Sequence, residues 1–254
     1  MRYRLDVAFH GRDFHGWQRQ PGPRTVQGEL ETWLTCLLGS ADPLAVTGAG
    51  RTDAGVHAAG MVAHFDSSTP FAPSDLCARL RSALPHDVVV SSITPVRDDF
   101  HARYSAMSRT YLYRISTEPS PFDADRAWHV HASLDAALLD SEARDILGEH
   151  DFSGFCRAKS RKDNTQCRIV ESSWRRQDGT LIYEVQADRF LHEMVRLLVG
   201  TIVDVARGRF PAGRAQEILR TGDVTLCGEA APAHGLTLHR VEYPPDGSTP
   251  RDSS

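Results

Sequence analysis

Gly48-Ala49-Gly50-Arg51-Thr52-Asp53-Ala54-Gly55-Val56-His57-Ala58 is the most informative stretch of this chain. Three glycines surround one carboxylate, Asp53, and Arg51 stands two residues before it. Glycine adopts backbone angles that other residues avoid, and it lets another backbone or a ligand approach closely. The stretch therefore predicts a shaped loop that presents Asp53.

Several interpretations of this loop compete. A turn aspartate that hydrogen-bonds its own backbone is the simplest. The dinucleotide fingerprint is excluded because its third glycine is missing, and the phosphate loop because Val56-His57 replaces Lys-Ser/Thr. A metal site formed by Asp53, His57 and His64 has spacings that match no metal signature.

Composition places the chain among ordinary globular proteins. It has 254 residues, of which 41% are hydrophobic and 24% charged, enough for one large domain or two small ones. The longest apolar segment, Met194 to Ala206, is interrupted by Arg196 and Asp204, and no N-terminal stretch resembles a signal peptide. The five cysteines form no CxxC pair, so we expect reduced thiols and a cytoplasmic location.

Charge is distributed unevenly. The net charge of −4 is unusual for a nucleic-acid binder. However, Phe100 to Thr117 carries three arginines and no acid, and Arg157 to Arg168 is also basic, which predicts a basic face. Arginine greatly outnumbers lysine, and its forked guanidinium suits phosphate.

Periodicity predicts an α/β fold with antiparallel or mixed sheets and a boundary near residues 100 to 110. Asp178-Gly179 is typical of a hairpin turn, Thr25 of a helix N-cap, Gly208 of a helix end, and Pro211 of the start of a short helix. We expect strands at residues 3–9, 61–65, 88–96, 109–115, 169–174, 181–187 and 236–243, and helices from Thr25 to Leu37 and at 73–84, 134–147 and 191–207. We expect a disordered polar tail from Pro244 to Ser254.

Arg196 lies in a helix that is apolar on almost every face. A buried guanidinium requires an anionic partner, because an unpaired buried charge costs several kcal/mol. Glu193, three residues earlier, and Asp53, from elsewhere in the fold, both qualify. Spacing alone favours Glu193.

Two further features of the sequence are typical either of residues packed in the core or of residues that contact RNA. Tyr111 lies in an alternating strand, where tyrosines usually pack in the core, but beside arginines it could stack on a nucleobase. The segment from Phe14 to Pro21 mixes aromatic and polar side chains, which fits a buried turn or an RNA-contacting loop.

Taken together, these motifs closely resemble the TruA-type tRNA pseudouridine synthases. The matches keep the family's order and reach to about Tyr243. They depart from it at Glu193, where the family often carries an amide or a histidine, and the stretch from Arg157 to Arg168 is looser than its flanks. The matching segments are residues 14–21, 24–27, 48–58, 100–106, 109–113, 190–196 and 232–236.

The resemblance implies isomerisation of uridine at positions 38, 39 and 40 in the anticodon arm of tRNA, without cofactor or metal. It implies two similar α/β halves, residues 1–105 with the aspartate loop and 106–243 with the tyrosine and the arginine helix. A continuous, mainly antiparallel sheet would join them, with the active cleft between them. It also implies a homodimer bridged by tRNA.

Residue roles follow from the resemblance as well. Asp53 would be the catalytic carboxylate and Arg196 its salt-bridge partner. Arg51 would help expel the target nucleotide, Tyr111 would stack on the uracil, and Leu236 would pack against the base. Six residues are expected as RNA contacts: Trp17, Gln18, Arg19, Arg24, Arg103 and Arg109.

The chemistry suits these residue types. The target base must leave its stack before C1′ and C5 can be reached. Breaking the glycosidic bond builds positive charge at C1′, which an ionised carboxylate can stabilise or trap. Because the base is recaptured, one carboxylate suffices, and an adjacent guanidinium keeps it charged. This reverses the preference for Glu193 as the partner of Arg196.

Three routes remain for Asp53: attack on C1′, attack on C6, and removal of the C2′ proton. Two other functions are weighed. One is a non-catalytic RNA-binding module on the same fold, from which the carboxylate would be expected to be lost. The other is a metal-dependent hydrolase that uses Asp53, His57 and His64.

Overall fold

The computed structural model describes residues 1–157 and 164–245, which divide into two compact units. The first comprises Met1–Ser108 with the described residues from Leu238 onward, and the second is Arg109–Thr237. The C-terminal half expected from the sequence ended at 243, whereas residues from Leu238 onward belong to the first unit. Most of the tail for which disorder was expected, residues 246–254, lies outside the described residues.

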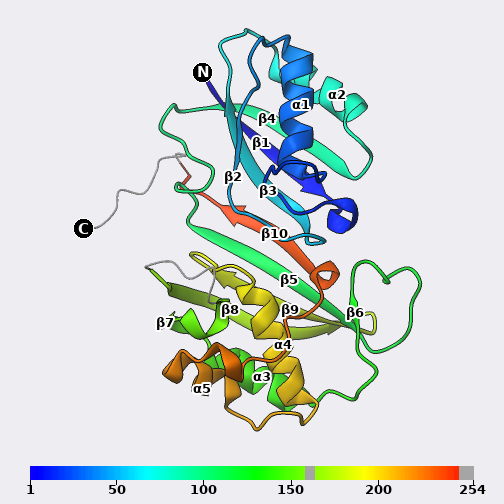
Figure 1. The fold of residues 1–254 in the computed structure, drawn as a ribbon, viewed down its shortest axis with the longest axis vertical. Helices are drawn as coiled ribbons and strands as arrows, with labels where there is room; N and C mark the ends of the chain where they lie inside the picture. The colour runs from blue at the N-terminus through cyan, green and yellow to red at the C-terminus, as the bar shows by residue number, and fades with distance from the viewer. Residues whose placement is uncertain (158–163, 246–254) are drawn as a thin grey trace. The chain divides into compact units, whose positions relative to one another are not determined.

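The first unit is an antiparallel sheet with two helices (Figure 1). β1 pairs with β3 on one side and with β4 on the other, so that Leu5 lies opposite both Ala63 and Ile93. β2 pairs with β3, and β10 lies beside β3. The elements are β1 (Arg2–Phe9), α1 (Val26–Leu38), β2 (Val46–Gly48), β3 (His57–Asp66), α2 (Pro73–Ala83), β4 (Val88–Val96) and β10 (Leu236–Glu242), of which the residues from Leu238 onward belong to this unit.

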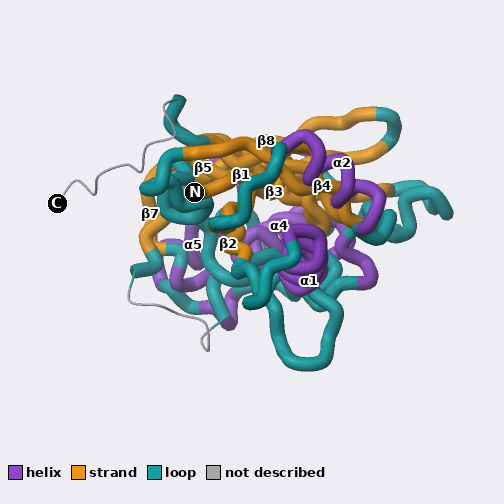
Figure 2. Tube along the Cα trace, turned by 90° about the horizontal axis from the view of Figure 1, so that it is seen from above, coloured by secondary structure: helices purple, strands orange, loops and turns teal. Residues whose placement is uncertain are grey.

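The described part of the second unit repeats this plan with three helices. Its sheet has the order β5-β9-β8-β7 with antiparallel pairs, and β6 pairs with β5 in parallel. Figures 1 and 2 both place α4 against one face of this sheet. The elements are β5 (Ser108–Ser116), β6 (Trp128–His129), α3 (Ala136–Asp145), β7 (Gly148–Asp151), β8 (Gln166–Gln177), β9 (Thr180–Ala187), α4 (Met194–Ala206) and α5 (Arg214–Thr221).

The predicted fold class, α/β with mainly antiparallel strands, is confirmed within each unit. The Thr25 side chain accepts a hydrogen bond from the Gly28 amide, as an N-cap does. Asp178 and Gly179 have φ of 48° and 78°, which fits the predicted hairpin turn between β8 and β9. The joining of the two halves in one sheet stays a prediction.

Two helix starts were predicted too early, for the same physical reason. The helix expected from Leu191 begins at Met194, because Glu193 has a left-handed backbone with φ of 58°. The helix expected from Pro211 begins at Arg214, because Gly213 has φ of 81°. A left-handed residue cannot lie inside a right-handed helix, so each marks the boundary.

The apolar helix α4 is buried as predicted. Each of its residues from Met194 to Ala206 is buried except Arg196. The segment that follows α5 lies directly against it, since the Ala231 amide donates to the Arg196 carbonyl over 2.9 Å. Across the described ranges, no helix combines the length and apolarity needed to cross a membrane.

Gly200, in the middle of α4, allows this close packing. A Cβ at this position would lie 1.9 Å from the Glu229 carbonyl oxygen. Alanine normally stabilises a helix interior by about 0.5–1 kcal/mol over glycine. We predict the opposite sign for Gly200→Ala, a loss of about 1–3 kcal/mol from overpacking, measured by urea unfolding. Stability at or above that of the wild type would show that this packing is not tight.

Candidate active site

The Asp53 loop connects β2 to β3 in the first unit. Asp53 is half-buried and Arg51 is exposed. The loop closes on itself, because the Val56 amide donates to the Asp53 carbonyl over 3.2 Å and Gly55 adopts φ of 80°. The expected shaped loop is therefore present, with its carboxylate at the boundary between core and solvent.

The loop rests on the backbone of the segment that follows β1. The Trp17 amide donates to the Thr52 carbonyl over 3.1 Å, and the Gly55 amide donates to the Phe14 carbonyl over 3.2 Å. Gly16 has φ of 88°, and a Cβ there would lie 2.7 Å from the Thr52 oxygen. These two hydrogen bonds fall on either side of Asp53 and hold its backbone in place.

Trp17 has a structural position instead of the predicted RNA contact. Its side chain is only 2% exposed, and a Cβ on Gly48 would lie 2.5 Å from its ring. Burial leaves the indole almost no surface for an RNA contact. The Trp17 ring therefore packs closely against Gly48, where the Asp53 loop begins.

Arg24, also predicted as an RNA contact, has its guanidinium engaged within the protein. Its Nη1 and Nη2 donate to the two Asp87 carboxylate oxygens over 2.7 and 2.9 Å, and its Nε donates to Glu29 over 2.7 Å. Its Cζ lies 4.1 Å from the centre of the Phe14 ring. These hydrogen bonds raise the pKa of Arg24 and lower that of Asp87. The arrangement supports a structural role for Arg24.

The other predicted RNA contacts are more accessible. Gln18 and Arg103 are exposed, and 60% of the Arg19 side chain is accessible although its guanidinium pairs with Glu31. In the second unit, Arg109 is half-buried and donates to the Asp188 carbonyl over 2.7 Å. Their contact with RNA stays a prediction.

His57 and His64 act as hydrogen-bond acceptors for the backbone. His57 Nδ1 accepts from the Gly11 amide over 3.0 Å, and His64 Nδ1 accepts from the Ala102 amide over 3.1 Å. Within residues 1–157 and 164–245, no three His, Cys, Asp or Glu residues gather as a metal site requires. The histidines proposed as metal ligands thus already have structural roles.

In the second unit, Tyr111 lies on β5 and is half-buried. Its ring meets Phe190 edge-on, with 5.2 Å between ring centroids and an angle of 89° between the planes. The tyrosine ring thus packs against the Phe190 ring.

Arg196 makes the local ion pair that spacing alone favoured. Its Nη1 lies 3.1 Å from Glu193 Oε1, and its Nε donates to the Ala231 carbonyl over 2.8 Å. Glu193 also pairs with Arg157. The pairing of Arg196 with Asp53 stays a prediction.

Leu236 is 5% exposed and follows a segment packed on Tyr113. The Tyr113 hydroxyl donates to the Pro232 carbonyl over 2.8 Å, and a Cβ on Gly235 would lie 2.6 Å from the tyrosine ring. Tyr113 therefore sets the position of the chain that leads to Leu236. Tyr113 lies two residues after Tyr111 in β5 and therefore on the same face of the strand, but no signal in the sequence marked its contact with Pro232.

Comparison with known proteins settles the family. A family model described as tRNA pseudouridine synthase matches residues 7–105 and 143–244. The chain belongs to the tRNA pseudouridine synthase family. The resemblance inferred from the sequence motifs is thereby confirmed, and the chain is an isomerase of this family.

Relatives match over nearly their whole length, and each is named tRNA pseudouridine synthase A. The protein from Cutibacterium acnes is 42% identical over 252 residues, which cover 96% of this chain and 90% of the relative. The protein from Hyphomonas neptunium is 40% identical over 246 residues, covering 96% and 98%. The protein from Azobacteroides pseudotrichonymphae is 37% identical over 244 residues, covering 96% and 97%.

His64 is expected to make stability depend on pH. Burial, together with the nearby charges of His101 and Arg2, lowers the pKa of His64 from 6.5 to about 4, although Asp66 opposes the shift. Between these values the unfolded chain binds more protons than the folded one. The contribution of neutral His64 is therefore complete above pH 6.5 and is lost as the pH falls toward 4.

The measurement is the free energy of unfolding by urea between pH 7 and pH 4, for the wild type and for His64→Asn. An asparagine oxygen can accept from the Ala102 amide but does not titrate in this range. We expect the variant to lose less stability than the wild type over this interval. Identical pH profiles would contradict a neutral, buried His64.

A second prediction separates structure from RNA binding at Arg24. Lysine cannot reproduce the forked contact with Asp87 together with the bond to Glu29. We expect Arg24→Lys to lower the free energy of unfolding by about 1–2 kcal/mol and to leave the Kd for tRNA unchanged. Arg79→Lys is the control, because Arg79 is exposed and donates only to the Leu37 carbonyl among the contacts described. A weaker Kd with unchanged stability would restore Arg24 as an RNA contact.

Proposed function

We propose that this protein converts uridine to pseudouridine in tRNA, at positions 38, 39 and 40 of the anticodon stem-loop, with Asp53 as its single catalytic carboxylate. The observation that carries the proposal is the glycine-framed loop that holds Asp53 half-buried in a chain of this family. The names of the relatives support tRNA as the substrate.

The reaction is an isomerisation and needs no co-reactant. The bond between N1 and C1′ breaks, the uracil turns, and a bond forms between C5 and C1′. The proton that leaves C5 is balanced by the proton that N1 gains. A carboxylate near C1′ can stabilise or trap the positive charge that develops as the first bond breaks.

The remaining residues supply positioning. Arg51, exposed beside Asp53, would enter the stack and help expel the target nucleotide, which costs a few kcal/mol. Tyr111, held edge-on by Phe190, would stack on the uracil. Arg196 would pair with Asp53 and keep it ionised, and Leu236 would pack against the base.

Assembly and location belong to the same proposal. We expect a homodimer bridged by tRNA, in line with the family resemblance. We also expect a cytoplasmic location, because five widely spaced cysteines without a CxxC pair favour reduced thiols. Both expectations are tested by the mass of the protein in solution and by fractionation of cells.

The decisive variant is Asp53→Asn, which keeps the shape of the side chain and removes its charge. We expect it to fold, to bind unmodified tRNA with the wild-type Kd, and to form no pseudouridine when products are mapped nucleotide by nucleotide. Pseudouridine formation by the variant would overturn the role of Asp53. Tight tRNA binding without any product from the wild type would indicate a non-catalytic RNA-binding module.

A further inference from the structure

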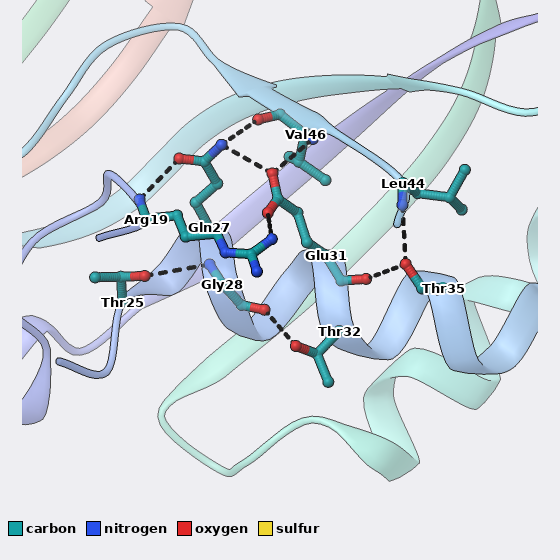
Figure 3. Close-up of polar contacts among 9 residues, drawn as sticks. All are labelled: Arg19, Thr25, Gln27, Gly28, Glu31, Thr32, Thr35, Leu44 and Val46. Atoms are coloured by element: carbon teal, nitrogen blue, oxygen red, sulfur yellow. Dashed lines mark hydrogen bonds and ion pairs between the residues drawn. The ribbon is translucent and has the colours of Figure 1, made fainter. Parts of the chain in front are cut away.

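Two side chains of α1 bind both polar groups of one residue in β2. Gln27 Nε2 donates to the Val46 carbonyl over 2.9 Å, and the Val46 amide donates to Glu31 Oε1 over 3.1 Å (Figure 3). Gln27 and Glu31 stand four residues apart, one turn of the helix, and Gln27 Nε2 also donates to Glu31 Oε1 over 2.9 Å. The pair offers β2 a donor and an acceptor, as a neighbouring strand would.

β2 needs this support because of its length and position. It has three residues, Val46–Gly48, and pairs with β3. Glu31 is buried, with 6% of its surface exposed. A buried peptide group that loses its partner costs about 1–3 kcal/mol, so these bonds strongly favour one position for Val46. Val46 is two residues before Gly48, where the Asp53 loop begins.

The side chains of Gln27 and Glu31 also bind Arg19, in the segment after β1 on which the Asp53 loop rests. The Arg19 amide donates to Gln27 Oε1 over 2.9 Å, and Arg19 Nη1 donates to Glu31 Oε2 over 3.0 Å (Figure 3). Arg19 follows two residues after Trp17, whose amide donates to the Thr52 carbonyl. The Trp17 carbonyl in turn accepts from the Gln27 amide over 3.0 Å.

The two chain segments that support the Asp53 loop are thus both bound by Gln27 and Glu31 of α1. The chain enters the loop through Val46, and the loop is supported at Thr52 through Trp17 and Arg19. We propose that Gln27 and Glu31 are positioning residues that set the place of the Asp53 carboxylate by holding these two segments together. The proposal rests on the proposed function and deepens it by naming what holds the reactive group.

The size of the expected effect follows from geometry. A displacement of about 1 Å at a reacting group can cost about 100-fold in rate. Because neither side chain belongs to the Asp53 loop, their loss should change the rate of the chemical step more than the binding of tRNA. A general loss of stability would instead reduce the rate only in proportion to the folded fraction.

The test uses the full chain and three variants at Gln27 and Glu31. Gln27→Met and Glu31→Met keep approximate volume and remove the hydrogen bonds, and Glu31→Gln retains an oxygen for the Val46 amide. The control is Thr32→Val on the same helix, where the hydroxyl donates to the Gly28 carbonyl, also drawn in Figure 3. For each variant we would measure the single-turnover rate with saturating unmodified tRNA, the Kd for tRNA, and the folded fraction.

We expect Gln27→Met and Glu31→Met to lose about 10- to 100-fold in single-turnover rate, with Kd changed by less than about threefold and the protein folded. Glu31→Gln should recover most of the rate lost by Glu31→Met, and Thr32→Val should match the wild type. Wild-type rates in both methionine variants, a loss confined to Kd, or a loss that follows the folded fraction would overturn the proposal. Absence of product from the wild type would instead overturn the proposed function.

Discussion

The close approach of two backbones is the constraint on which the aspartate loop depends. Residues 52–56 lie against residues 11–17 with hydrogen bonds between the two main chains. A Cβ on Gly11 would lie 2.0 Å from the Val56 oxygen, and one on Gly16 would lie 2.7 Å from the Thr52 oxygen. Such contact requires glycine, because any side chain would force the two segments apart. The backbone on either side of Asp53 is therefore held by main-chain contacts with residues 11–17.

The residues that support the Asp53 loop differ from those that are predicted to react. Helix α1 holds both β2 and the supporting segment, and Trp17 fills the space beneath them. Arg51 and Asp53 remain at the solvent boundary, where a substrate can reach them. In the second unit, the buried helix α4 carries Arg196 as its single residue that is not fully buried. Asp53 thus stands on a loop held by main-chain contacts, and Arg196 stands on a helix held by packing.

The sequence patterns predicted most elements and the shaped loop that presents Asp53, but not the contacts of the residues around it. Trp17 stood in a segment whose mixture of aromatic and polar side chains fitted either a buried turn or an RNA contact, and Arg24 was expected as an RNA contact from the family resemblance. The burial of Trp17 and the ion pairs of Arg24 give each side chain a structural role that the sequence did not predict. The contribution of Glu31 was missed, since an acidic residue on an amphipathic helix is normally exposed to solvent.

What the sequence determined by itself depends on interactions between neighbours along the chain. The N-cap at Thr25, the turn at Asp178-Gly179 and the glycine-framed loop all follow from local backbone preferences. Only the tertiary structure decided which distant groups would meet, such as Arg24 and Asp87, which are 63 residues apart. The physical reason is that a buried polar group must find a partner, but its identity depends on the packing of segments that local preferences do not specify.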